Sequence, residues 1–171
     1  MATNTEALSP TSLGLEAMER SRAWLNGLLD TLTPEQFFAR PEGTRTHAMY
    51  VIGHLAFADQ GFLGYLGVDD RIVPDAWTES FNFKKETVSD SPNDFPPVEE
   101  VREVAQKVRD RLLEHFRSLT PEQLAAPFDA DFQMFASCPA ALMSSIAYHE
   151  GFHSGQIATI RQALGLAPVM M

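Results

Sequence analysis

The sequence is poor in features that would point to several large classes of protein. Its single cysteine, Cys138, cannot form an intrachain disulfide, which is typical of a reducing compartment. No apolar run approaches the roughly 20 residues of a membrane-spanning helix. Basic residues are outnumbered 13 to 23, and the formal charge of −10 does not favour binding to nucleic acid or anionic membranes. The opening residues, MATNTEALSP, lack the basic and apolar regions of a signal peptide. We therefore expect a cytoplasmic protein.

The rest of the composition is that of an ordinary globular protein. Hydrophobic residues fill 44% of the 171 positions, enough for a core without disulfides, and we expect one domain over residues 1–171. Four segments repeat apolar residues at steps of three or four, and none alternates convincingly as a strand does. They cover residues 12–32, 46–66, 97–119 and 139–164. The predicted fold class is all-α, a four-helix bundle.

Residues typical of helix ends flank these segments. Ser9 or Ser12 is placed to cap the first helix and Ser137 the last, because a serine oxygen accepts from a backbone N–H of the first turn. Pro97 and the two glutamates after Val98 suit the start of the third helix. Gly165 is typical of the residue just beyond a helix C-terminus.

The phrase LTPEQ occurs twice, at 32–36 and at 119–123. In each copy the threonine can cap a short turn with proline in its first position, which predicts two similar helix–turn–helix halves, the alternative being chance recurrence. The long connection 67–96 between the halves suits a crossover between two parallel helices, and so an up-down-down-up order. It also contains aromatic residues that we expect to pack on the bundle in part: Trp77, Phe81 and Phe83.

Residues 149–153 read HEGFH, the HExxH pattern of zinc proteases. On a helix that turns about 100° per residue, His149 and His153 lie about 40° apart, so both imidazoles can bind one metal ion. They also lie within an apolar stripe of the predicted helix: Leu142, Ile146, Ile157, Ile160 and Leu164. The alternative is a pair of core histidines satisfied by hydrogen bonds.

The protease interpretation fails on its own requirements. Such enzymes take a third ligand C-terminal to the pair, and after His153 the chain has no His, Asp, Glu or Cys. Glu150 points about 80° away from the direction midway between the two histidines. We therefore expect Glu150 at the rim, either as an acid or base or as a solvated surface charge.

The best third ligand lies upstream, in the predicted second helix. His54 belongs to an apolar stripe within YVIGHLAF, and its alternative role is again that of a core histidine. Three histidines leave coordination positions open, as catalytic metal sites do. Three glycines on this helix would let a neighbouring helix come close: Gly53, Gly61 and Gly64.

The other two histidines fit structural roles better. His47 lies about 10 Å before His54 along the same helix, too far to share its metal. We expect it in the first turn or at the mouth of the site. His115 lies near the end of the third helix, where the helix dipole favours a protonated histidine. Asp59 is rotated about 140° from His54 and should not reach the ion.

With GHL in the second helix and HEGFHSGQIATIRQALGLAP in the fourth, the chain resembles the DinB/YfiT-like superfamily. The resemblance covers most of the chain, most specifically in the fourth helix. It implies an up-down-down-up bundle, commonly a homodimer. It also implies a Ni²⁺ or Zn²⁺ ion held by three histidines, which match His54, His149 and His153. Characterised members of that superfamily include enzymes that use low-molecular-weight thiols, such as bacillithiol transferases and mycothiol-dependent maleylpyruvate isomerase, and many others are supposed hydrolases or stress-induced proteins.

We therefore expect a metal-dependent enzyme, a thiol-dependent S-transferase or a related hydrolase. The catalytic candidates are Glu150, as acid or base, and Gln156, as a hydrogen-bonding partner of a ligand or an imidazole. Aromatic residues that could line the substrate mouth are Tyr50, Tyr65 and Trp77. The alternatives are a non-catalytic metal-binding or stress-response protein, and a metal-free bundle.

Overall fold

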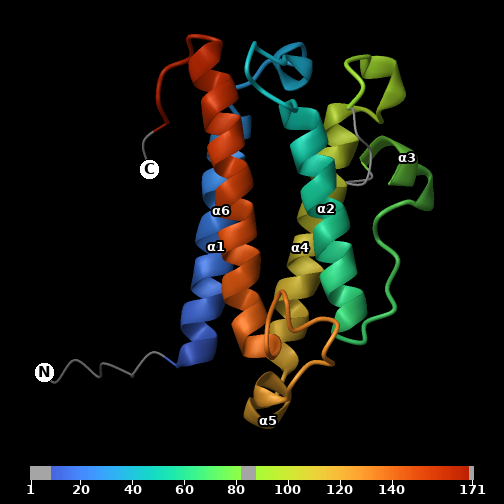
Figure 1. Cartoon of the computed structure of the whole chain (residues 1–171), viewed down its shortest axis with the longest axis vertical. Coiled ribbons are helices and arrows are strands. Elements are labelled where there is room, and N and C mark those ends of the chain that lie inside the picture. The colour runs from blue at the N-terminus through green and yellow to red at the C-terminus, as the bar shows by residue number, and fades with distance from the viewer. Residues whose placement is uncertain (1–8, 82–87, 170–171) are drawn as a thin grey trace, which may run out of the picture.

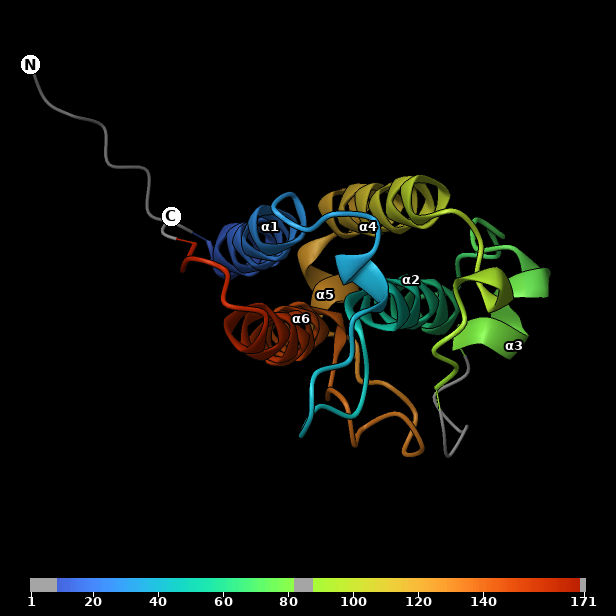
Figure 2. The ribbon, with the colours of Figure 1, turned by 90° about the horizontal axis from the view of Figure 1, so that it is seen from above.

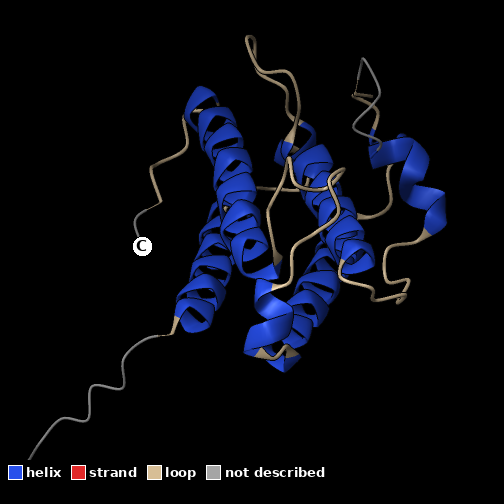
Figure 3. Cartoon of the chain, turned by 60° about the horizontal axis from the view of Figure 1, so that its bottom comes forward, coloured by secondary structure: helices blue, strands red, loops and turns tan. Residues whose placement is uncertain are grey.

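The computed structural model describes residues 9–81 and 88–169. Within these ranges it has six α-helices and no strand, which confirms the all-helical prediction (Figure 3). Four helices are long: α1 (Pro10–Leu29), α2 (Ala48–Tyr65), α4 (Val98–Ser118) and α6 (Pro139–Ala163). The shorter elements are α3 (Thr78–Phe81), α5 (Pro121–Ala125) and the 3₁₀ turns η1 (Gln36–Phe38), η2 (Asp75–Trp77) and η3 (Pro92–Asp94).

The ends of the long helices agree with their capping residues, with one exception. Ser9 caps α1, because its Oγ accepts from the Ser12 backbone N–H at 3.1 Å. Gly165 follows α6 with a φ of +73°, which favours glycine. The expectation that Ser137 caps α6 is wrong: Cys138 occupies the N-cap position and makes no side-chain cap bond.

The two LTPEQ copies make the same local turn. Thr120 and Gln123 form a capping box at the start of α5, each side chain accepting from the other's backbone N–H. Thr33 and Gln36 exchange the same two bonds, at 3.4 and 2.9 Å, but only the 3₁₀ turn η1 follows. The two turns lie at opposite ends of the long helices (Figure 1).

The four long helices stand at the corners of a square when seen from above (Figure 2). The helix α6 packs mainly on α1, and α2 mainly on α4, whereas α2 and α6 contact each other less. The helix α4 shows the pattern most clearly, with apolar side chains at three- and four-residue steps facing inward: Val101, Ala105, Val108 and Leu112. In the described ranges, no helix has both the length and the apolar character needed to span a bilayer.

Part of the connection between α2 and α4 packs on the long helices, as expected. Trp77 and Phe81 are buried, while Phe83 lies outside the described residues. A Cβ on Gly53 would lie 2.1 Å from the Phe81 ring, so this glycine makes room for the crossover. Around Gly61 and Gly64 there is open space. The expectation that a neighbouring helix comes close is therefore confirmed at Gly53, where Phe81 of α3 makes the contact, and wrong at Gly61 and Gly64.

Candidate metal centre

Three imidazoles meet between α2 and α6. His54 from α2 places its Nε2 3.3 Å from Nε2 of His149, and His153 places its Nε2 3.0 Å from the same atom. One ligand nitrogen from each ring lies within 4.8 Å of the other two, so the group could hold a metal ion. We call these residues the histidine triad. They are the three that the sequence spacing selected.

The donor set and its spacing fit a first-row divalent ion. Nitrogen ligands bind zinc at about 2.0–2.1 Å, and a tetrahedral angle then separates two of them by roughly 3.3–3.4 Å. The separations of 3.0 and 3.3 Å about His149 lie close to that value. Three protein ligands leave at least one position for a water or a substrate.

Burial keeps the triad in the form that binds metal. Burial, together with the neighbouring His153 and His149, lowers the pKa of His54 to about 3. Burial and His153 lower the pKa of His149 to about 4. Burial also lowers the pKa of His153, against the opposing effect of its hydrogen bond to Gln156. At neutral pH the three rings are uncharged and their lone pairs are available.

Gln156 fixes the orientation of one imidazole. Its Oε1 lies 2.7 Å from Nδ1 of His153, one turn earlier on α6. Since an amide oxygen only accepts, Nδ1 carries the proton, and the lone pair of Nε2 faces the triad. Such a partner is a frequent second neighbour of a metal-bound histidine.

Aromatic rings flank the triad on both helices. Tyr50 is stacked on His54, with ring centres 6.2 Å apart and planes at 7°, and burial raises the pKa of its hydroxyl. Phe152 meets His153 edge-on at 5.2 Å and is 57% exposed. The other two residues expected at a mouth lie elsewhere: Tyr65 stacks on Phe132, and Trp77 packs against Phe81.

The positions expected for the histidines and for Glu150 are exchanged. Glu150 is fully buried, whereas His149 and His153 are only partly buried, so the rim location expected for Glu150 is wrong. The buried stripe of α6 passes through Leu142, Ile146, Glu150, Ser154, Ile157 and Arg161. The histidines lie to one side of it. A charged carboxylate can occupy the core only when it is paired and hydrogen-bonded, and here it is both.

Glu150 belongs to a cluster with one member from each long helix: Arg22 of α1, Asp59 of α2, Arg109 of α4 and Glu150 of α6. We call it the charge quartet. No side chain in it is more than 6% exposed, and its two positive and two negative charges sum to zero. Arg109 donates to both oxygens of Asp59, at 2.8 and 3.0 Å, and to Glu150 at 2.8 Å. Arg22 donates to Glu150 at 2.5 Å and to Asp59 at 3.1 Å.

Two hydrogen bonds to residues outside the quartet satisfy further polar atoms of its side chains. Arg22 donates to the Ala105 carbonyl at 2.8 Å, and the Ser21 hydroxyl donates to Glu150 at 2.6 Å. Burial alone would lower the pKa of Arg109, but the charges of Asp59 and Glu150 raise it. The guanidinium therefore stays charged at any physiological pH.

The sequence interpretation missed the quartet, although a signal was present. Each member interrupts a buried apolar stripe, as Arg22 does between Met18 and Leu25. Asp59 was considered only as a metal ligand, and it indeed lies outside the triad. Two positive and two negative side chains on the inward faces of the four long helices indicate that these residues pair with one another.

The two remaining histidines have local surroundings of their own. His47 is the N-cap of α2: its Nδ1 accepts from the Tyr50 backbone N–H, and its Nε2 lies 2.9 Å from the Ser89 carbonyl. His115 lies in the last turn of α4, where burial and Arg111 lower its pKa and so oppose the protonated form that the helix dipole favours. Its Nε2 has no hydrogen-bond partner within the described residues.

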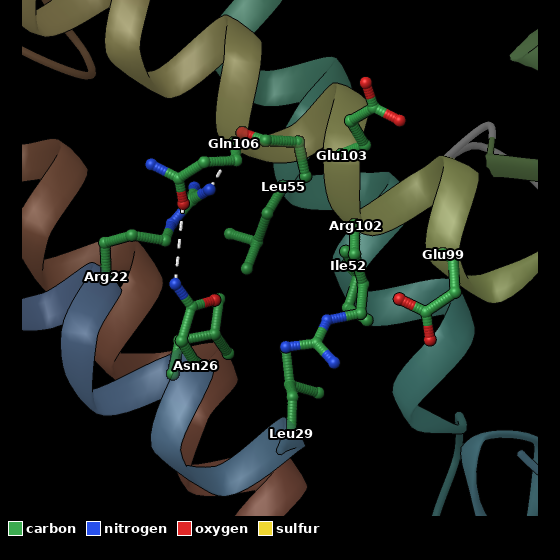
Figure 4. Close-up of a pocket in the computed structure, with 11 residues that line it drawn as sticks. Arg22, Asn26, Leu29, Ile52, Leu55, Glu99, Arg102, Glu103 and Gln106 are labelled. Atoms are coloured by element: carbon green, nitrogen blue, oxygen red, sulfur yellow. Dashed lines mark hydrogen bonds between the residues drawn. The ribbon is translucent and has the colours of Figure 1, made fainter.

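A crevice of about 460 Å³ opens between α1 and α4, away from the triad (Figure 4). Its floor is apolar and comes from α1 and α2: Leu25, Leu29, Ile52 and Leu55. Asn26 and Gln106 face each other across it, at 3.4 Å. The floor residues are almost completely covered by their neighbours. Arg22, a member of the quartet, also lines this crevice.

Comparisons with known proteins bear on the fold and the family. A family model described as the DinB superfamily matches residues 17–157. A crystal structure of a conserved protein from Enterococcus faecalis superposes with a TM-score of 0.66 at 20% identity. The match covers 91% of this chain and 97% of that one, and at this identity it bears on the fold alone. Comparison with curated proteins gives no match.

Proposed function

Since the chain belongs to the DinB superfamily, we propose that it is a metal-dependent enzyme whose histidine triad holds one Ni²⁺ or Zn²⁺ ion. Its reaction is the transfer of a low-molecular-weight thiol to a small-molecule substrate, or a related hydrolysis. The observation that supports this proposal best is that one ring nitrogen from each of three histidines lies within 4.8 Å of the other two, although His54 and His149 are 95 residues apart in sequence.

The chain's own residues would contribute charge and orientation to this chemistry. A divalent ion lowers the pKa of a bound thiol or water, which supplies a nucleophile near neutral pH. Neutral imidazoles from His54, His149 and His153 add no negative charge, so an anionic ligand such as a thiolate is favoured. Gln156 keeps the proton of His153 on Nδ1. Tyr50, with a raised hydroxyl pKa, stays protonated and can donate a hydrogen bond.

Of the two catalytic candidates, Gln156 fits the proposal better as a positioning residue. Glu150 is less suited to proton transfer, because Arg22, Arg109 and Ser21 already donate to its two carboxylate oxygens. An acid or base must reach the reacting group through a hydrogen bond, and a carboxylate with both oxygens occupied is poorly placed for that.

We also infer that residues 1–171 form one bundle of up-down-down-up order. In Figure 1 the colour gradient rises along α1 and α6 and falls along α2 and α4, which supports this order. A homodimer, a cytoplasmic location and the absence of nucleic-acid or membrane partners complete the proposal. The net charge of −10 supports the last of these.

Elemental analysis of the untagged chain tests the metal centre. We expect about one Ni²⁺ or Zn²⁺ per wild-type chain, and loss of the ion in His54→Ala and His149→Ala. His115→Gln is the matched control, since it removes a histidine outside the triad and should keep the ion. Absence of a stoichiometric ion after reconstitution would contradict the proposal. A bound ion without turnover across a panel of thiols and electrophiles would instead favour a non-catalytic metal-binding protein.

A further inference from the structure

The charge quartet and the histidine triad share the same two helices. Both carboxylates of the quartet come from the helices that carry the triad, Asp59 from α2 and Glu150 from α6. Asp59 follows His54 by five residues, about 7.5 Å along the helix axis, and Glu150 directly follows His149. Each of the two helices therefore presents ligands on one face and an ion-paired carboxylate on another.

Each guanidinium of the quartet joins these two helices. Arg22 contacts Glu150 and Asp59, and Arg109 contacts the same two carboxylates. The arginines themselves come from α1 and α4, on which α6 and α2 mainly pack. The separation of α2 and α6 determines the distance between His54 and His149. In the core, that separation is bridged twice by a planar group with fixed N–H directions.

Stability alone does not account for so many buried charges. Apolar side chains of similar volume often replace a buried ion pair at no cost, because removing the charges from water is expensive. Apolar packing, however, tolerates small shifts of one helix along another, whereas a fork-shaped guanidinium between two carboxylates does not. A metal site needs its ligand atoms within a few tenths of an ångström of their ideal places.

We propose, on the basis of the metal centre proposed above, that the charge quartet is a positioning device for the histidine triad. It sets the spacing and rotation of α2 against α6, so that the three Nε2 atoms meet at metal-binding distance. Its members touch neither the ion nor the substrate. Their loss therefore changes the affinity and geometry of the metal site even where the bundle remains folded.

The variant that tests this role removes one pair of oppositely charged residues and so keeps the net charge of the core at zero. Arg22→Met with Glu150→Met leaves Arg109 and Asp59 as a two-bond ion pair. We expect this double variant to retain the helical content and the melting temperature of the metal-free wild type. Its dissociation constant for Co²⁺, used as a probe, should rise about tenfold or more, and the visible absorption bands of bound Co²⁺ should shift.

Two further variants complete the test. Arg161→Met is the matched control: it removes a buried arginine outside the quartet, which lies on α6 and donates to the Leu28 and Ala167 carbonyls, and it should leave the Co²⁺ affinity and spectrum unchanged. Arg22→Lys serves if the double variant does not fold. It keeps the charge but not the fork, and we expect the same direction of change, of about threefold or more.

The outcomes separate the two proposals. A folded double variant, or Arg22→Lys, with wild-type Co²⁺ affinity and spectrum would overturn the positioning role while leaving the metal centre intact. Equal loss of affinity in Arg161→Met would also overturn it, since any weakened core would then suffice. A wild-type chain that takes up no Co²⁺ would overturn the metal centre and the positioning role together.

Discussion

His149 and Glu150 are neighbours in sequence, yet they belong to two polar clusters of opposite character. The histidine triad gathers three neutral rings, half-buried, with the same kind of nitrogen turned toward a common point. The charge quartet gathers two cations and two anions, fully buried, with donors matched to acceptors. A cluster whose lone pairs converge is suited to bind a metal ion, whereas a cluster whose hydrogen bonds are complete is suited to fix the helices relative to one another.

The largest expected effect on stability comes from removing one charged side chain of the quartet. Glu150→Ala leaves Arg22 and Arg109 sharing one carboxylate in the core, and we expect the free energy of unfolding to fall by about 3–5 kcal/mol. Urea unfolding of the metal-free protein measures it. Glu114→Ala, at an exposed ion pair of α4, should change stability by less than about 0.5 kcal/mol. Equal effects of the two substitutions would remove the distinction between the buried and the surface charges.

Binding of a metal ion at the triad should stabilise the folded protein. At a Zn²⁺ concentration one hundred times its dissociation constant, we expect wild-type stability to rise by about 2.7 kcal/mol. Thermal unfolding with and without Zn²⁺, reversed by a chelator, measures the gain. His54→Ala should show no gain. A wild-type unfolding temperature that is insensitive to the ion would argue that the triad is only a group of core histidines.

Gln156 offers a smaller effect confined to the triad. Gln156→Ala removes the acceptor that holds the proton on Nδ1 of His153, and the metal affinity should fall by about tenfold, or about 1.4 kcal/mol. Competition with a chromogenic chelator measures the affinity. Gln133→Ala, at an exposed site away from the triad, is the control and should bind as wild type does. Unchanged affinity in Gln156→Ala would exclude the orienting role.

The pH dependence of the metal-free protein gives the smallest effect. In the folded chain the pKa values of His54 and His149 are about 3 and about 4, below the 6.5 of an unperturbed histidine, with burial as the first cause. As pH falls below 6.5, the unfolded chain takes up protons that the folded chain does not, so stability decreases toward those values.

Allowing for the partial exposure of the rings, we expect a loss of about 1 kcal/mol from these groups between pH 7 and 5. Denaturation midpoints across this range measure it. His54→Gln with His149→Gln removes both groups and should flatten the slope. An unchanged slope in this variant would show that other groups cause the pH dependence.

Much of the helical structure could be predicted because it follows from local rules. The periodic apolar residues placed the four long helices to within about two residues at most ends, and Ser9 and Gly165 act as their types suggest. The spacing of His149 and His153 put both rings on one side of α6, since that depends only on the helical repeat. The close contact of Gly53 with Phe81 could not be predicted, because Phe81 comes from the connection between α2 and α4 and not from the same helix.

The sequence by itself determined which side chains share a face of each helix, and so brought His149 and His153 together. Only the tertiary structure decided which face turned inward. Glu150 lies in the core because Arg22, 128 residues earlier, and Arg109 meet it there. The rotation of α6 about its own axis depends on the residues that the other helices present to it. A carboxylate such as that of Glu150 is buried only where residues of those helices neutralise its charge.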